Sequence, residues 1–377
     1  MDQPTKKPKV GYPIAELRTP CYVIDAAVAK RNCQRMQDRA TKLGCKLRPH
    51  VKTHKTLEGG VIQTGGTKKG IVVSTLAEAQ FFATGGFDDI LYAVPITPDK
   101  LKEAGELTNS LTQFHIIVDH PVTLQAVLNA APAPGKKWSI WIMVDCGYHR
   151  DGVDPEDPAA VQLAVDIAGS DHATLGGIYT HGGHSYDSKS VEEIVKIGED
   201  EREAVVLFAE RLRSKGVQVP EVGVGSTPTC SLPPAHLKGV TEMHPGNYFA
   251  YDTMQVDLGS CKLEDIAVKV LTRVIGQYPK SNMLLVDLGW TGCSAQGKEC
   301  GYGVLDKPEL RIKTLKQEAG EVEPAQHGDR LDMDKYPIGS IIALAPFHSC
   351  ASTKQHSKVH VVENGIVVDE WKIASGW

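Results

Sequence analysis

The residues of this sequence with the clearest capacity for chemistry lie around Lys52. The segment RPHVKTHK (residues 48–55) surrounds that lysine with two histidines and two further basic residues, at the end of a predicted strand. Neighbouring positive charge and burial both lower the pKa of a lysine, which favours the nucleophilic free amine. A solvated lysine at a strand end is the alternative interpretation, and Lys52 alone does not decide between them.

A second candidate pair is His348 and Cys350 in the segment PFHSC (residues 346–350), directly after an apolar run. In extended backbone, residues two apart point to the same side, so both side chains could reach one ion. Nitrogen and thiolate ligands together favour zinc, and two protein ligands would leave a catalytic metal open. Without further context, a packed thiol beside a polar loop histidine fits the same residues.

Three further segments are rich in glycine and hydroxyl groups. They are YTHGGHSY (residues 179–186), GVGSTPT (residues 223–229) and GNY (residues 246–248). Small residues let backbone N–H groups and hydroxyls approach an anion, and the last two segments follow the predicted seventh and eighth strands, the usual phosphate site of a barrel. His181 and His184 could be read as metal ligands, but no nearby residue completes such a site.

The elements that must position these residues alternate short β-branched runs with amphipathic stretches from Thr19 to about Asp257. This pattern is typical of β-α units on a parallel sheet, and eight strands in this order favour a closed (β/α)8 barrel over residues 19–257. Chemistry should then lie at the carboxyl ends of the strands. The predicted strands are 46–51, 71–74, 90–94, 114–118, 139–145, 174–180, 221–225 and 240–245, with helices that include 26–43, 76–84 and 191–215.

Residues 258–377 have a different texture. Strands are predicted at 266–275, 283–288, 338–345 and 359–368, with no convincing helix between them. We therefore expect a second, mostly antiparallel β domain, to which residues 1–18 could add by strand pairing.

The composition favours a protein that acts on small molecules. The 377 residues carry a net charge of -5, which gives no reason to expect nucleic acid. No apolar run is long enough to span a membrane, and the N-terminus lacks a signal peptide, so a cytoplasmic protein is expected. The nine cysteines are scattered and form no CxxC pair, which argues against a disulfide framework.

The run PHVKTHK (residues 49–55) resembles the cofactor-lysine motif of the alanine-racemase-like family that contains D-threonine aldolases and eukaryotic-type D-serine dehydratases. The resemblance extends over nearly the whole chain. It implies a pyridoxal-phosphate-binding barrel followed by a β domain, working as a homodimer on a small D-amino acid. Lys52 would be both the Schiff-base lysine and the base at the substrate α-carbon.

The resemblance also implies roles for single residues around the cofactor ring. Arg150, in VDCGYHRDG (residues 144–152), matches the arginine that faces the pyridine nitrogen. Because arginine stays protonated, it can only donate to that nitrogen, and the ring becomes a weaker electron sink. Tyr179 is expected beside the ring, with His181 and Tyr186 nearby.

The same resemblance points to phosphate contacts and to a metal. Thr227, Gly246 and Asn247 match the phosphate contacts, and Ser226 is a plausible addition. D-threonine aldolases carry HxD where this chain has His348-x-Cys350, whereas D-serine dehydratases carry HxC, which implies Zn2+.

The predicted reaction is dehydration of D-serine by β-elimination to pyruvate and ammonia, with zinc on the leaving hydroxyl. A D-threonine aldolase, which would cleave the Cα–Cβ bond, is the nearest alternative. A non-catalytic pyridoxal-phosphate carrier is the second alternative, although the β domain and the HxC segment argue against it. A racemase is also conceivable, but the sequence offers no clear second base.

Overall fold

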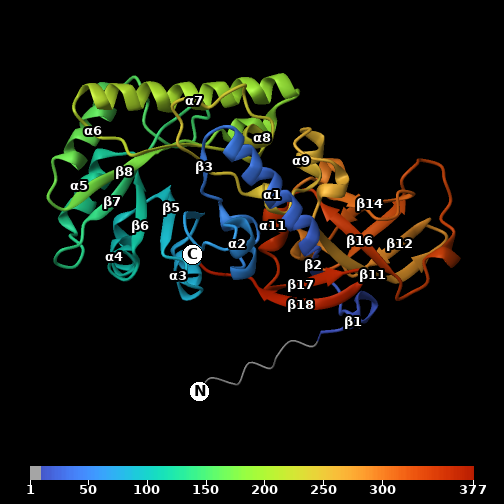
Figure 1. Cartoon of the computed structure of the whole chain (residues 1–377). Coiled ribbons are helices and arrows are strands. Elements are labelled where there is room, and N and C mark those ends of the chain that lie inside the picture. The colour runs from blue at the N-terminus through green and yellow to red at the C-terminus, as the bar shows by residue number, and fades with distance from the viewer. Residues whose placement is uncertain (1–9) are drawn as a thin grey trace, which may run out of the picture. The chain divides into compact units, whose positions relative to one another are not determined.

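The computed structural model describes residues 10–377, and the chain divides into two compact units (Figure 1). The barrel unit consists of Cys33–Tyr248 and Ala374–Trp377, and the β unit of residues 10–32 and Phe249–Ile373. Residues 1–9, the start of the predicted N-terminal segment 1–18, lie outside the described residues. Within residues 10–377, no helix combines the length and apolar character needed to cross a bilayer.

Eight parallel strands form the sheet of the barrel unit, in the order β3-β10-β9-β8-β7-β6-β5-β4. A parallel bridge between His50 and Val72 joins the two ends of this order, so the predicted (β/α)8 barrel is confirmed. Each strand overlaps one of the eight predicted runs. The strands are β3 (Lys46–Leu47), β4 (Ile71–Val73), β5 (Asp89–Pro95), β6 (Gln113–Val118), β7 (Trp138–Met143), β8 (Ala173–Tyr179), β9 (Glu221–Val224) and β10 (Glu242–Met243).

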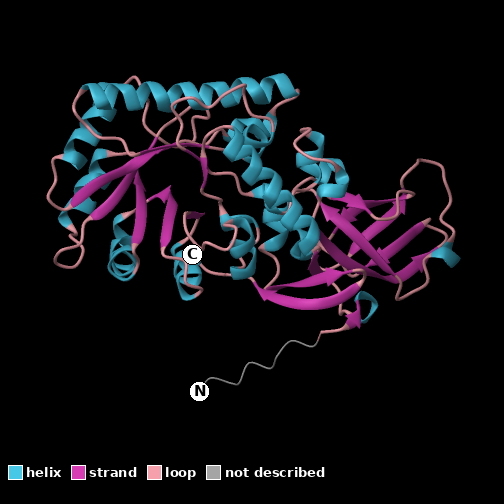
Figure 2. Ribbon diagram, in the orientation of Figure 1, coloured by secondary structure: helices cyan, strands magenta, loops and turns pink. Residues whose placement is uncertain are grey.

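Helices alternate with these strands along the chain (Figure 2). Helices α3, α6 and α7 each begin after a residue whose side chain accepts a backbone N–H of the first turn, namely Thr75, Asp157 and Ser190. The helices are α1 (Ala26–Lys42), α2 (Leu57–Gln63), α3 (Leu76–Thr84), α4 (Leu101–Ser110), α5 (Pro121–Asn129), α6 (Pro158–Ala168), α7 (Val191–Ser214) and α8 (Thr227–Ser231). The predicted helices at 26–43, 76–84 and 191–215 are thus confirmed.

The interior of the barrel is filled by side chains from neighbouring strands. A buried cluster joins residues of the five neighbouring strands β4 to β8, namely Val72, Leu91, Ile117, Trp141, Met143 and Tyr179. Tyr179 belongs to this cluster and also ends β8, so the packed core extends to the carboxyl end of the strands. That end is where barrel chemistry is expected.

The β unit is a mostly antiparallel sheet, as predicted, with the path β1-β18-β17-β2-β11-β12-β15-β14 and with β16 joining β11 to β13. Its buried core includes Leu17, Val23, Leu271 and Val367. The strands are β1 (Tyr12–Pro13), β2 (Cys21–Ile24), β11 (Val268–Tyr278), β12 (Met283–Val286), β13 (Gly303–Leu305), β14 (Leu310–Leu315), β15 (Gly320–Pro324), β16 (Ile341–Pro346), β17 (Lys358–Glu363) and β18 (Ile366–Lys372). Three short helices, α9 (Thr253–Asp257), α10 (Trp290–Cys293) and α11 (Ser349–Thr353), complete the unit.

The prediction of one strand over residues 359–368 is wrong. The run forms two antiparallel strands, β17 and β18, joined by a tight turn at Asn364 and Gly365. Both turn residues have positive φ angles, 49° and 76°, which asparagine and glycine adopt more readily than other residues.

Candidate active site

Lys52 lies just beyond the carboxyl end of β3, in the short 3-10 helix Val51–Thr53. His50 caps this helix, because its Nδ1 accepts the backbone N–H of Lys52 at 3.3 Å. The other ring nitrogen, Nε2, lies 3.2 Å from the hydroxyl of Ser74. A Cβ atom added to Gly246 would come within 2.7 Å of the carbonyl oxygen of His50, so the loop after β10 can pass this turn only with glycine.

The buried imidazoles of His50, His181 and His244 act electrostatically on one another, and Lys52 acts on those of His50 and His181. Burial, reinforced by the charge of Lys52, lowers the pKa of His181 to about 3 and that of His50 well below its ordinary value. Burial likewise lowers the pKa of His244, with Arg48 as the next cause. These rings are therefore neutral at pH 7, and His181 donates its Nδ1–H to the carbonyl oxygen of Gly225 at 2.8 Å.

The expectation that crowded positive charge surrounds Lys52 needs correction. The neighbouring histidines are neutral, and each of the two other basic residues in the segment has carboxylate partners. Lys55 pairs with the buried Glu78, and Arg48 pairs with Glu242 and Asp89. The feature of Lys52 that the structure supports is partial burial beside neutral rings.

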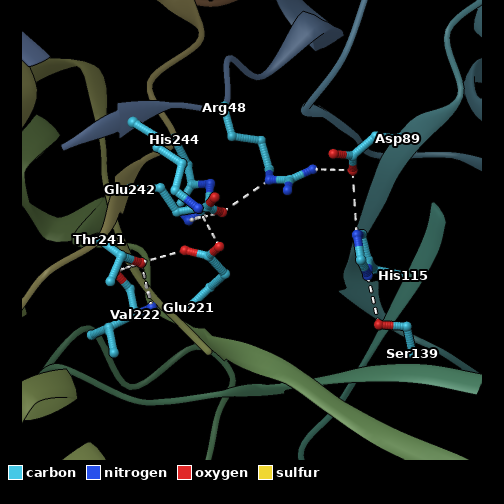
Figure 3. A network of polar contacts seen from close by, with 10 residues as sticks. Arg48, Asp89, His115, Ser139, Glu221, Val222, Thr241, Glu242 and His244 are labelled. Carbon is cyan, nitrogen blue, oxygen red and sulfur yellow. Dashed lines mark hydrogen bonds and ion pairs between the residues drawn. The ribbon is translucent and has the colours of Figure 1, made fainter. Parts of the chain in front are cut away.

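Arg48 is the centre of a buried polar network that the sequence analysis did not anticipate (Figure 3). Its guanidinium lies between two carboxylates, with Nε 2.9 Å from Glu242 and Nη1 2.6 Å from Asp89. His115 extends the network, since its ring nitrogens lie 3.3 Å from Asp89 and 2.7 Å from the hydroxyl of Ser139. The partners are far apart in sequence, so the motif around Lys52 carries no signal for them.

The aromatic side of the site is built from Tyr179, His244 and Tyr148. Tyr179 is buried at the end of β8, and its ring centroid lies 4.5 Å from that of His244. The guanidinium carbon of Arg150 lies 5.1 Å from the ring centroid of Tyr148, while its nitrogens bond the neighbouring carboxylate of Asp151 at 3.2 Å. Arg150 also lowers the pKa of His181, which brings it within electrostatic reach of the predicted ring site.

Tyr148 and the 3-10 helix Gly183–Asp187 complete this side. Tyr148 stacks on His184 with ring centroids 5.8 Å apart, and the partly buried Tyr186 belongs to the same 3-10 helix. Tyr148 lies inside the segment 144–152 from which only Arg150 was singled out. Tyr148 could have been predicted as a site residue, because it is an aromatic residue two positions before the candidate cofactor-binding Arg150.

The predicted phosphate loops contain one hydroxyl that suits an anion. The Thr227 hydroxyl is buried and has no hydrogen-bond partner among the described residues 10–377. Ser226, in contrast, already accepts the N–H of Thr229 as the cap of α8 and lies 2.8 Å from the hydroxyl of Ser185. Thr227 therefore fits a phosphate contact, with Gly246 and the buried Asn247 on the loop after β10, and Ser226 is engaged in holding the loop.

His348 has extended backbone, with φ -134° and ψ 105°, but Cys350 already lies in a helix, so the prediction of one extended run through both residues is wrong. β16 ends at Pro346, His348 is the N-cap of α11 and Cys350 lies in its first turn, because Asp252 accepts the N–H and hydroxyl of Ser349 there. His348 Nδ1 lies 2.5 Å from the side-chain amide oxygen Oε1 of Gln296. Donation to Gln296 leaves Nε2 as the basic nitrogen, the tautomer that a metal-binding histidine adopts.

Gln296 is a further residue that the sequence analysis missed, since it lies 52 positions from His348. Within residues 10–377, no group of three or more histidine, cysteine, aspartate or glutamate side chains is arranged to hold a metal. The chemistry of the donor set, an imidazole with Nε2 unprotonated and a thiol two residues away, fits a site with two protein ligands and open positions.

Comparisons with known proteins agree with both units. The model of the alanine racemase N-terminal domain family matches residues 24–251, and that of a serine dehydratase domain matches residues 267–362. The D-serine dehydratase of Dictyostelium discoideum is 38% identical over 97% of this chain and 98% of its own length. The D-serine dehydratase of Schizosaccharomyces pombe is 31% identical over 99% of this chain and 95% of its own.

Solved structures give the same result. The D-threo-3-hydroxyaspartate dehydratase of Delftia sp. HT23 is 34% identical, covers 97% of this chain and all of its own, and superposes with a TM-score of 0.92. A cysteine-to-alanine mutant of a D-threo-3-hydroxyaspartate dehydratase, solved in the metal-free form, has the same TM-score at 33% identity. The chain therefore belongs to the D-serine dehydratase family, which joins an alanine-racemase-like domain to a serine dehydratase domain.

Proposed function

We propose that this protein dehydrates D-serine with pyridoxal 5'-phosphate at Lys52 and zinc at His348 and Cys350. The observation that carries the proposal is the placement of Lys52 at the carboxyl end of the barrel, beside neutral buried imidazoles. The names of the relatives, D-serine dehydratases at 38% and 31% identity over nearly the whole chain, support the same substrate.

The residues of the barrel unit fit the cofactor. Lys52 would hold it covalently, and the unsatisfied hydroxyl of Thr227, with Gly246 and Asn247, would hold its phosphate. Tyr179, His181, Tyr186 and Arg150 would surround the ring. When bound, pyridoxal phosphate supplies an electron sink for the bond broken at the substrate α-carbon.

The part of the reaction assigned to Lys52 is proton transfer. As a free amine it would remove the proton from Cα of D-serine. Arg150 would donate a hydrogen bond to the ring nitrogen and keep that nitrogen unprotonated. The neutral His50 and His181 add no positive charge beside the amine, and their fixed hydrogen bonds hold the turn that carries it.

The metal would act on the second bond, between Cβ and the hydroxyl group. Zinc is a Lewis acid that lowers the pKa of bound water from 15.7 to about 7, which makes hydroxide a far better leaving group. His348 Nε2 and the Cys350 thiolate would be its protein ligands, with Gln296 fixing the histidine tautomer. A metal-free mutant of a dehydratase relative, made at a cysteine, supports a metal in this family. Loss of the α-proton and the hydroxide releases water, and hydrolysis of the resulting enamine gives pyruvate and ammonia.

The test of this function has two arms. Borohydride reduction of the purified holoprotein followed by peptide mapping should place the label on Lys52, and pyruvate should form from D-serine but not after chelation. Label on another residue would refute the cofactor assignment. Full pyruvate formation in metal-free protein would refute the metal assignment while leaving Lys52 intact.

A related substrate is the second candidate, because a D-threo-3-hydroxyaspartate dehydratase is 34% identical over 96% of this chain. D-serine and D-threo-3-hydroxyaspartate should be compared by kcat/KM. D-threonine separates dehydration from aldol cleavage: 2-oxobutyrate and ammonia indicate a dehydratase, and glycine and acetaldehyde indicate an aldolase.

The assembly and location belong to the same proposal. We expect a homodimer, which sedimentation of the holoprotein tests, and a cytoplasmic location, which imaging of the tagged full chain tests. A monomeric, fully active holoprotein would contradict the first expectation. Accumulation in any other compartment would contradict the second.

A further inference from the structure

Glu201 is a buried carboxyl group that the proposed reaction does not use. It lies on α7, a helix rich in charged residues, yet its exposed fraction is 1%. Burial raises its pKa to about 7. An ionisable group is rarely kept in such a place unless its hydrogen bonds serve a purpose.

The partners of Glu201 lie on two different loops of the barrel unit. Its Oε1 accepts the N–H of Gly182 at 2.5 Å, on the loop after β8. The N–H of Gly225 and the hydroxyl of Thr229, after β9, also bond its carboxyl group and lower its pKa against the effect of burial. One side chain thus joins the loop that carries His181 to the loop that carries Thr227.

The loop after β8 passes close to this carboxyl group. A Cβ atom on Gly182 would come within 2.6 Å of the carboxyl carbon of Glu201, so a larger residue at position 182 would displace that carboxyl group. The two loops also meet directly, through the 2.8 Å contact between Ser185 and Ser226. Glu201 reinforces that contact from the helix side.

The ionisable groups that face Glu201 do not neutralise it. They are Tyr179 on β8, Cys146 after β7 and Cys230 on α8. Burial raises the pKa of each of them, that of Cys146 to about 12, so all three are uncharged near pH 7. The carboxyl group is therefore held by hydrogen bonds rather than by an ion pair.

We propose that Glu201 is a positioning residue that fixes the loop after β8 against the loop after β9 and so pre-forms the phosphate site at Thr227. The role rests on the proposed function only in naming the ligand, since the loop order itself needs no cofactor. Glu201 acts through Gly182 and Gly225 and does not touch the reacting atoms.

Glu201→Gln is the test variant. The glutamine amide oxygen can still accept the N–H of Gly182. Its NH2 group would face the N–H of Gly225, and because both groups are donors the Gly225 N–H would lose its hydrogen-bond acceptor. The affinity of the apoprotein for pyridoxal phosphate should fall about ten-fold, the usual effect of one buried unpaired donor. The affinity for pyridoxal, which lacks the phosphate, should stay unchanged. Glu203→Gln, an exposed change two residues away on α7, is the matched control and should alter neither affinity.

Hydrogen exchange on the apoprotein provides the second readout. The Gly182 and Gly225 amides should be protected in the wild type and exchange faster in Glu201→Gln. Where that variant does not fold, Glu201→Asp keeps the carboxylate but withdraws it by one methylene, and should weaken binding of the phosphate form alone.

Unprotected Gly182 and Gly225 amides in the wild type would overturn the proposal, as would equal losses for pyridoxal and its phosphate. If exchange behaves as expected but borohydride leaves Lys52 unlabelled, the proposed function fails and the positioning role stands.

Discussion

Replacing Arg48 by methionine tests whether the buried network of Figure 3 depends on one cation. The change removes the guanidinium and strands two carboxylates, Asp89 and Glu242, inside the barrel wall. Breaking a buried ion pair by removing one partner costs about 3–5 kcal/mol, because the remaining charge is uncompensated. We expect the free energy of unfolding of the barrel unit to fall by that amount at pH 8.

The loss should depend on pH with a definite sign. Burial already raises the pKa of Glu242 above its ordinary value, and Arg48 opposes that rise. Without Arg48 the pKa of Glu242 in the folded state rises further above its pKa in the unfolded state. The loss of stability is therefore smaller at pH 5 and grows as the pH rises toward the folded-state pKa. Adding Glu242→Gln to Arg48→Met removes one stranded charge and should restore part of the stability.

Urea unfolding followed by tryptophan fluorescence provides the assay, and one of the five tryptophans, Trp141, has its ring centroid 5.7 Å from the Arg48 guanidinium. Lys196→Met is the control, since the pair of Lys196 with Asp200 is exposed and should matter little. A loss below about 1 kcal/mol in Arg48→Met, or an equal loss at pH 5 and pH 8, would refute the reasoning.

Three further outcomes are expected. The pKa of His181 is about 3 in the folded state and near 6.5 in the unfolded state, so protonation of this imidazole favours unfolding. Acidification below pH 6.5 should therefore lower the free energy of unfolding, measured with urea, by up to about 1.4 kcal/mol per pH unit for this residue. A stability that does not change with pH in both the wild type and His181→Asn would contradict this. Gln296→Leu should weaken zinc binding about 10–100-fold by freeing the tautomer of His348, measured by competition with a chelator, and unchanged zinc affinity would argue against the hydrogen bond. Gly246→Ala should displace the turn at His50 and weaken pyridoxal phosphate binding, measured by titration of the apoprotein, and wild-type affinity would show that the loop can yield.

The barrel was predictable because its strands are short β-branched runs whose period differs from that of the helices between them. The hairpin at residues 358–372 was also within reach, since Asn364-Gly365 is a turn signal that outweighs the continuous β propensity on either side. The strand pair β14 and β15 was missed because its residues alternate with charged ones over a short length.

For the candidate active site, the sequence predicts which residues take part but not their protonation states or hydrogen-bond partners. The sequence indicates Lys52, but not the neutral state of His50 and His181, which arises from burial by distant segments. Gln296 and Glu201 carried no local signal. Gln296 bonds His348, which is 52 positions away in the sequence, and Glu201 is a buried carboxyl group in a helix rich in charged residues. The helical backbone at Cys350 was mispredicted because the first turn of α11 bonds the distant Asp252 through Ser349.

The barrel has its shortest runs of paired residues where β9, β10, β3 and β4 adjoin, and we call this part of the sheet the seam. β10 shares two residue pairs with each of its neighbours, and His50 meets Val72 by a single bridge. Since the runs of paired residues are shortest there, native-state fluctuations should begin at this seam. A ligand bonded both to Lys52, after β3, and to Thr227, after β9, would connect the two sides of this seam. Binding of that ligand should then slow local opening of the barrel as well as supply the reactive group.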